Sequence, residues 1–135
     1  MMKVFIDTAA WIALVNERDD LHYPALEASK KLRQAQSTLI TTEFVLLEVA
    51  DGLCNLSTRS SAINFIESLY RLPKLKIIQL DQSLYQKGWQ LYKQRLDKEW
   101  SLTDCISFVV MKQEIITQAF TSDRHFEQAG FTKLL

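Results

Sequence analysis

The stretch that decides the fold is KVFIDT at residues 3–8, a short apolar run that ends in a carboxylate. Lys3–Ile6 predicts a buried β-strand, and the apolar residues around Trp11–Val15 predict a helix directly after it. This alternation of short strand and helix continues along the chain. The expected strands are Lys3–Ile6, Thr38–Thr41, Lys76–Leu80, Gln118–Thr121 and, at an edge, Phe131–Leu134.

Strands that alternate with helices predict a parallel sheet covered on both faces. We therefore expect an α/β fold, a three-layer α/β/α sandwich with a central parallel sheet of four to five short strands. The sequence has neither repeats nor a Pro/Gly-rich linker, and its 135 residues fit one domain, 1–135.

Local signals place the helices. An apolar helix is expected over Glu43–Leu53, and Ser101 is expected to open another. Asp81 is placed to cap a helix whose apolar residues Tyr85, Trp89, Tyr92 and Leu96 are spaced 4-3-4. A short final helix should run from Asp123 to a stop at Gly130.

Composition excludes several classes of protein. Sixteen basic and sixteen acidic residues cancel, which argues against a strongly basic nucleic-acid-binding coat, although a local patch could still exist. Cys54 and Cys105 have no metal or redox spacing, so we expect buried, reduced thiols in helices. No apolar run reaches the ~18 residues of a membrane span, and Asp7 interrupts the apolar start that a secretory signal would need. We expect a cytoplasmic protein with no membrane partner.

Two carboxylates follow strands of the expected sheet. Asp7 ends the first strand and Asp123 closely follows the fourth. Ligands of open α/β sheets bind beyond the carboxyl ends of the strands, so both acids should lie at a binding edge. Each could instead cap the helix that follows it, as could Thr8.

Two further carboxylates lie in apolar helical stretches. Glu48 is surrounded by apolar residues around most of its helix, although a solvated position remains open. Asp104 heads the apolar row Phe108, Met111 and Ile115 and also matches a capping box with Ser101, two roles that can coexist.

Four such acids require neutralisation, because carboxylates ~5 Å apart repel by about 3 kcal/mol at an effective dielectric of 20. Mg²⁺ or Mn²⁺ would remove that penalty and could activate water for attack on a phosphodiester. Thr8 and Thr121 are placed to hydrogen-bond a carboxylate or a bound phosphate. Three glycines make neither a phosphate-binding loop nor a dinucleotide fingerprint, and His22 and His125 are expected to be ordinary surface or capping residues.

The segments that carry these acids resemble the PIN-domain family, and within it the VapC-type toxins of bacterial toxin–antitoxin pairs. They are Val4–Thr8, Thr42–Glu48, Leu102–Phe108 and Thr121–Phe126. The resemblance implies a compact α/β/α sandwich, Mg²⁺- or Mn²⁺-dependent endoribonuclease activity, a homodimer and inhibition by a small antitoxin.

Carried over residue by residue, the resemblance makes Asp7, Glu48, Asp104 and Asp123 the catalytic metal-site acids, with Asp7 and Asp104 as direct ligands. His125 is a departure, because many relatives have a further acid in the last motif.

Our leading hypothesis is a metal-dependent ribonuclease of the toxin type. The alternative is a catalytically silent module of the same fold that binds RNA or a protein partner. Contacts to RNA are expected from Arg95, Lys98 or Arg124.

Overall fold

The computed structural model describes residues 2–135 and contains a five-stranded, all-parallel sheet in the order β3-β2-β1-β4-β5. This confirms the predicted parallel sheet and its edge strand. Consecutive strands such as β1 and β2 are aligned from Lys3 opposite Thr38 to Phe5 opposite Ile40. The strands are β1 (Lys3–Ile6), β2 (Thr38–Thr42), β3 (Leu75–Ile78), β4 (Gln118–Phe120) and β5 (Thr132–Lys133).

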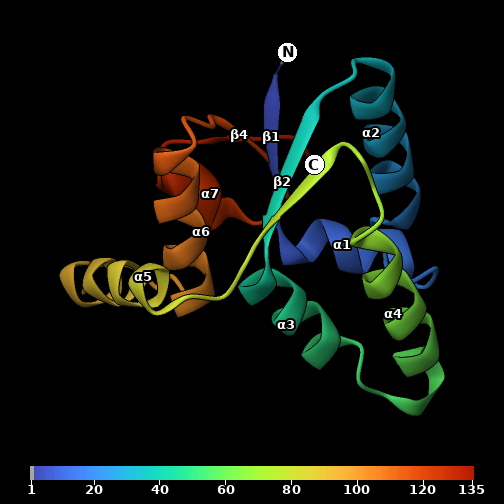
Figure 1. Ribbon diagram of the computed structural model, residues 1–135, viewed down its shortest axis with the longest axis horizontal. Helices are drawn as coiled ribbons and strands as arrows, with labels where there is room; N and C mark the ends of the chain where they lie inside the picture. The colour runs from blue at the N-terminus through green and yellow to red at the C-terminus, as the bar shows by residue number, and fades with distance from the viewer. Residues whose placement is uncertain (1) are drawn as a thin grey trace.

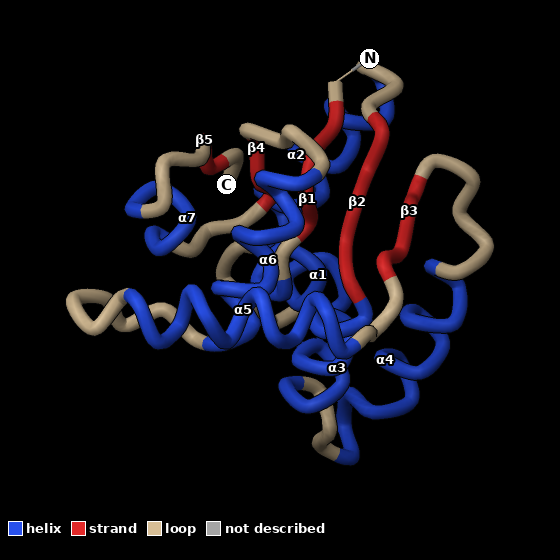
Figure 2. Tube along the Cα trace, turned by 60° about the vertical axis from the view of Figure 1, so that its left-hand side comes forward, coloured by secondary structure: helices blue, strands red, loops and turns tan. Residues whose placement is uncertain are grey.

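Helices cover both faces of the sheet, as Figures 1 and 2 show. Helices α1, α2 and α4 lie on one side, and α5, α6 and α7 lie on the other, while α3 lies at the carboxyl end of β2. The predicted α/β/α sandwich is therefore confirmed. The helices are α1 (Thr8–Val15), α2 (His22–Gln34), α3 (Glu43–Gly52), α4 (Leu56–Leu69), α5 (Gln82–Gln94), α6 (Leu102–Gln113) and α7 (Arg124–Gln128).

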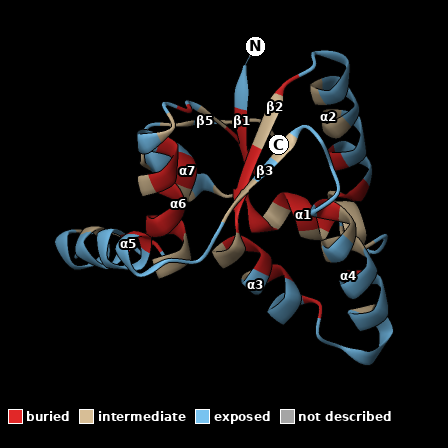
Figure 3. Ribbon diagram, viewed as in Figure 1, coloured by how far each residue is buried: buried red, intermediate tan, exposed pale blue. Residues whose placement is uncertain are grey.

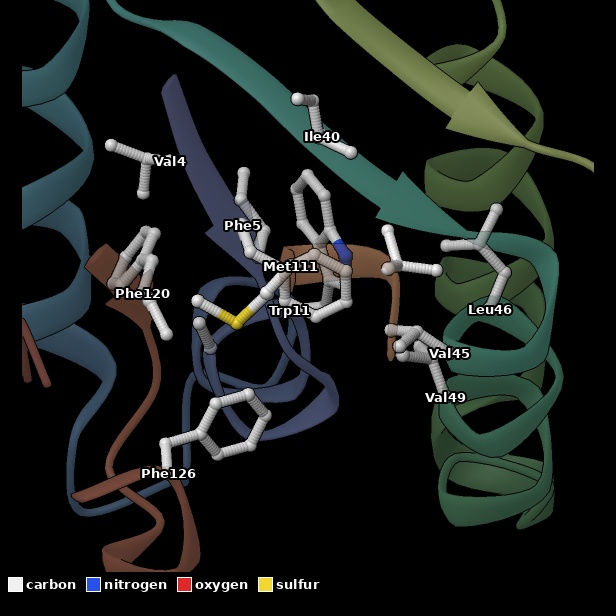
Figure 4. Packing of buried hydrophobic residues seen from close by; sticks show 14 of the residues in the cluster. Val4, Phe5, Trp11, Ile40, Val45, Leu46, Val49, Met111, Phe120 and Phe126 are labelled. Atoms are coloured by element: carbon white, nitrogen blue, oxygen red, sulfur yellow. The ribbon is translucent and has the colours of Figure 1, made fainter. Parts of the chain in front are cut away.

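The core surrounds β1, whose Val4, Phe5 and Ile6 are all buried (Figures 3 and 4). A strand in the middle of a parallel sheet is covered on both faces, which explains an apolar run without alternation. On the α6–α7 side, the ring of Phe126 lies 6.3 Å from that of Phe5 and 4.9 Å from that of Phe108, centroid to centroid. These contacts fix α6 and α7 against the strand that ends in Asp7.

Helix α5 packs closely on α6, but its aromatic row does not. A Cβ at Gly88 would collide with the side chain of Ile106 and lie 3.2 Å from its Cα, so glycine allows this approach. Tyr85, Trp89 and Tyr92 remain 46%, 41% and 43% exposed. The aromatic residues of the 4-3-4 row thus lie largely on the outside of α5, because Gly88 and Leu84 make its buried face.

The expectation that both cysteines are buried holds for one of them. Cys105 is buried as expected, but Cys54 is exposed in the segment between α3 and α4, because α3 already ends at Gly52. Within residues 2–135, no helix combines the length and the apolar character that a membrane crossing requires.

Candidate metal centre

The candidate site lies at the carboxyl end of the sheet, where the chain leaves neighbouring strands in opposite directions. β1 lies between β2 and β4 in the sheet, and the chain continues from β1 into α1 on one face and from β4 into α7 on the other. Such a switch of direction opens a crevice beyond the strand ends. Asp7 and Asp123 both lie there, at the N-cap positions of α1 and α7.

Asp7 is a buried carboxylate that does not cap its helix. Its side chain makes no capping bond to α1; instead Oδ2 accepts a hydrogen bond of 2.8 Å from the Thr121 hydroxyl. Burial raises the pKa of Asp7 to about 7, against the lowering effect of hydrogen bonds from the Thr121 hydroxyl and the Thr8 backbone N–H. The charges of Asp104 and Glu48 raise this pKa further. The capping alternative for this side chain is therefore wrong.

Asp104 has both of the roles that its sequence position allowed. Its Oδ2 accepts from the Ser101 backbone N–H at 3.2 Å, while the Ser101 Oγ accepts from the Asp104 N–H at 3.0 Å, which completes a capping box. Burial raises the pKa of Asp104, and a hydrogen bond from His125 partly opposes that rise. The carboxylate also lines the cleft described below.

Asp123 caps α7 and is tied to Asp7 through one hydroxyl. Its Oδ1 accepts from the His125 backbone N–H at 2.9 Å, and its own N–H donates to the Thr121 Oγ1 at 3.0 Å. Because the Thr121 hydroxyl donates to Asp7 in turn, it holds the two strand-end acids in a fixed relation. This arrangement agrees with the expectation that Thr121 would hydrogen-bond a carboxylate.

Glu48 reaches the same place from α3. It is half-buried, which agrees with its apolar helical surroundings, and its charge acts on Asp7. Together the four acids border one open cleft of about 310 Å³. The cleft is lined by Asp7, Thr8, Ala9, Glu48, Glu99, Ser101, Asp104, Asp123 and His125.

The structure places the three expected RNA-contacting cations outside that lining. The guanidinium of Arg95 makes two hydrogen bonds to Asp97, at 2.9 and 3.0 Å, and lies 4.7 Å from the centre of the Trp100 ring. Lys98 is half-buried, and Arg124 is exposed beside Asp123 at the start of α7. Lys98 and Arg124 are nevertheless adjacent in sequence to residues of the cleft, Lys98 to Glu99 and Arg124 to Asp123 and His125.

Neither histidine is an ordinary surface residue, although His22 fits the capping alternative, because its Nδ1 contacts a carbonyl oxygen in the last turn of α1. His125 lies in the cleft, with Nδ1 3.0 Å from Asp104 Oδ2 and 3.5 Å from Asp123 Oδ1. His22 is buried where α2 begins, with Nδ1 2.7 Å from the Ala13 carbonyl oxygen. Sequence reasoning also missed Glu99. For His125, the available signal was its position two residues after Asp123, a candidate ligand. The same position is also typical of a residue in the first turn of a helix.

The residues fit a divalent cation. Five of the nine lining residues carry a carboxylate and none is Lys or Arg, so the cleft concentrates negative charge without a fixed counterion. The Oγ1 atom of Thr8 is buried there without a hydrogen-bond partner, although unpartnered buried hydroxyls are rare. Oxygen donors of this kind are the ligands that Mg²⁺ and Mn²⁺ accept.

Comparison with known proteins agrees with this geometry. The 23S rRNA-specific endonuclease VapC20 of Mycobacterium tuberculosis is 25% identical over 131 residues, 97% of each chain. The crystal structure of that protein, described as a sarcin-ricin loop cleaving toxin, matches with a TM-score of 0.83 at 25% identity and covers 96% of both chains. VapBC2 from Rickettsia felis, bound to a DNA fragment from its promoter, matches at 17% identity with a TM-score of 0.68, covering 98% of this chain and 97% of that one. This last likeness shows the fold alone.

The family model, like these relatives, matches nearly the whole chain. The model of the PIN domain covers residues 4–132, and that span includes all five acids that line the cleft. The protein belongs to the PIN domain family.

Proposed function

We propose that this chain is a divalent-metal-dependent endoribonuclease that hydrolyses RNA phosphodiester bonds, acting from a single domain over residues 1–135 as the toxin of a toxin–antitoxin pair. The observation that carries the proposal is the cleft in which Asp7, Glu48, Asp104 and Asp123 converge without a Lys or Arg side chain. Family membership and the full-length similarity to a ribosomal RNA endonuclease support it.

Asp7, Glu48, Asp104 and Asp123 would hold Mg²⁺ or Mn²⁺. When bound, such an ion lowers the pKa of water and stabilises charge on a scissile phosphate. The chain supplies the preorganisation: Thr121 fixes Asp7 and Asp123, and the capping box fixes Asp104 at the start of α6. Thr8 has a free buried hydroxyl for a group in the cleft.

RNA and a small antitoxin are the partners that we propose. Two structures with the same fold are VapBC complexes, which supports an antitoxin partner.

Arg124 is our candidate for a phosphate contact, because it is exposed beside Asp123, whereas Arg95 is engaged with Asp97 and Trp100. Binding of RNA to Arg124→Ala at two salt concentrations would measure that contribution, since a lost phosphate contact lowers the salt dependence.

We also propose a homodimer in which α5 contacts a second copy. Tyr85, Trp89 and Tyr92 form an exposed row along that helix, and the Trp89 and Tyr92 rings stack at 5.4 Å. Exposed apolar rows of this kind commonly mark interfaces. Trp89→Lys should shift the chain toward the monomer in light scattering, whereas Leu56→Lys, at an exposed apolar site on α4, should not. A dimer unchanged by Trp89→Lys would place the interface elsewhere.

The direct test of the function is RNA cleavage by the purified chain with Mn²⁺, with Mg²⁺ and with a chelator. Cleavage should require the metal, and the metal should raise the melting temperature because it binds only the folded protein. At 100 times its Kd, the ion should stabilise the fold by about 2.7 kcal/mol. A chain that binds RNA but neither cleaves it nor gains stability from metal would instead be the silent binding module.

A further inference from the structure

His125 is the one residue in the cleft that brings a nitrogen atom close to two of the acids. Its Nδ1 is 3.0 Å from Asp104 Oδ2 and 3.5 Å from Asp123 Oδ1. Within residues 2–135, these three side chains form a group in which one ligand atom from each lies within 4.8 Å of the others. The sequence contains one other histidine, His22, whose Nδ1 contacts the Ala13 carbonyl oxygen in the α1–α2 region.

The backbone of α7 holds this histidine in place. The His125 N–H donates to Asp123 Oδ1, so the same carboxylate that borders the cleft also fixes the start of the helix. The next residue, Phe126, is fully buried and packs against Phe5 and Phe108. The imidazole is thus positioned between a capped helix start and a core anchor, and only 20% of its side chain is exposed.

The distances match those between neighbouring ligands of one ion. In an octahedral site with metal–ligand bonds of about 2.1 Å, adjacent ligand atoms are about 3 Å apart and opposite ones about 4.2 Å. The two Nδ1–oxygen distances of 3.0 and 3.5 Å fall near the adjacent value. In the free protein, the same closeness allows a hydrogen bond between the imidazole and Asp104.

We propose that His125 is a ligand of the bound cation through Nδ1, next to Asp104 and Asp123, and that it makes the site prefer a transition ion such as Mn²⁺ to Mg²⁺. This rests on the proposed metal-dependent function and names the residue that selects its metal. Imidazole nitrogen binds first-row transition ions well, whereas Mg²⁺ strongly favours oxygen. Thr8 also lines the cleft, and its buried hydroxyl, which has no hydrogen-bond partner, independently indicates that the cleft receives a ligand.

The matched variant is His125→Asp, which keeps a ligand of similar reach but replaces nitrogen with oxygen. The side chain is partly exposed, and its backbone N–H, which completes the α7 cap, is unaffected. Kd values for Mn²⁺ and Mg²⁺ are measured by calorimetry on the metal-free chain. We expect the preference for Mn²⁺ over Mg²⁺ to fall about tenfold in His125→Asp, a change typical of altered ligand surroundings. An unchanged preference would overturn the selectivity.

A spectroscopic readout separates a ligand from a mere hydrogen-bond partner of Asp104. Pulsed electron paramagnetic resonance of Mn²⁺ on the ¹⁵N-histidine-labelled chain should show the coupling of one directly bound nitrogen, and His125→Asp should lose it while still binding Mn²⁺. Mn²⁺ bound to the wild type without that coupling would overturn the inference alone. Absence of any Mn²⁺ binding by the wild type would overturn the proposed function as well.

Discussion

Asp7→Asn is expected to reduce Mn²⁺-dependent RNA cleavage on the order of 10³-fold, at the upper end of what removal of one preorganised electrostatic group costs. Asparagine has the same shape, and its Oδ1 can still accept the hydrogen bond that Thr121 now donates to Oδ2. What disappears is the negative charge of the most deeply buried acid of the cleft. Initial rates on a labelled RNA would give the ratio, and circular dichroism would verify the fold.

The matched control for this loss is Asp51→Asn. Asp51 lies on α3, the helix that carries Glu48, but it is exposed and outside the cleft lining. The control should cleave RNA at the wild-type rate. Undiminished cleavage by Asp7→Asn, together with undiminished cleavage by Asp104→Asn, would contradict a catalytic metal centre at these acids.

The same Asp7→Asn substitution should stabilise the protein when metal is removed. Burial raises the pKa of Asp7 from 3.8 to about 7, so between these values the folded chain keeps a proton that the unfolded chain has released. The free energy of unfolding must therefore fall as pH rises from about 4 to 7, and the penalty is complete above pH 7. This rise in the pKa of Asp7 corresponds to a loss of about 4 kcal/mol in the free energy of unfolding, as an upper bound.

Urea denaturation in a chelator, from pH 4.5 to 8.5, measures this effect. Asp7→Asn should be more stable than the wild type at pH 8, and the advantage should shrink toward pH 4.5. Addition of Mn²⁺ should reverse the order at pH 8, because only the wild type gains the full binding energy. A wild-type stability that is flat or rises between pH 5 and 8 without metal would contradict the buried, raised Asp7.

The sequence was informative about the four acids because each one occupies a recognisable place in a strand or helix. Asp7 and Asp123 follow strands that are neighbours in a parallel sheet, so their approach required only the correct strand order. Glu48 and Asp104 could be singled out because a carboxylate among apolar helical residues needs a partner. The dual role of Asp104 in a capping box and in the cleft was also accessible, since both depend on its place at the start of α6.

The parts that sequence reasoning missed depend on how elements pack. The approach of His125 to Asp104 depends on the angle between α6 and α7, which the Phe108–Phe126 contact sets and no local pattern encodes. The spacing of the aromatic residues of α5 predicts a helix, but the face that turns inward is decided by the contact of Gly88 with Ile106. The spacing of apolar residues identifies an apolar face of a helix, but it does not identify the element that packs against that face.

The position of β4 has a consequence for when the protein becomes active during its synthesis. β4 inserts beside β1, the Asp7 N–H donates to the Phe120 carbonyl oxygen, and the Thr121 hydroxyl joins Asp7 to Asp123. A nascent chain that ends before residue 120 therefore lacks both the hydroxyl that orients Asp7 and the last carboxylate. The ribosome must release β4 before the cleft can exist, so an unfinished copy of this chain is without a complete site for cleaving RNA.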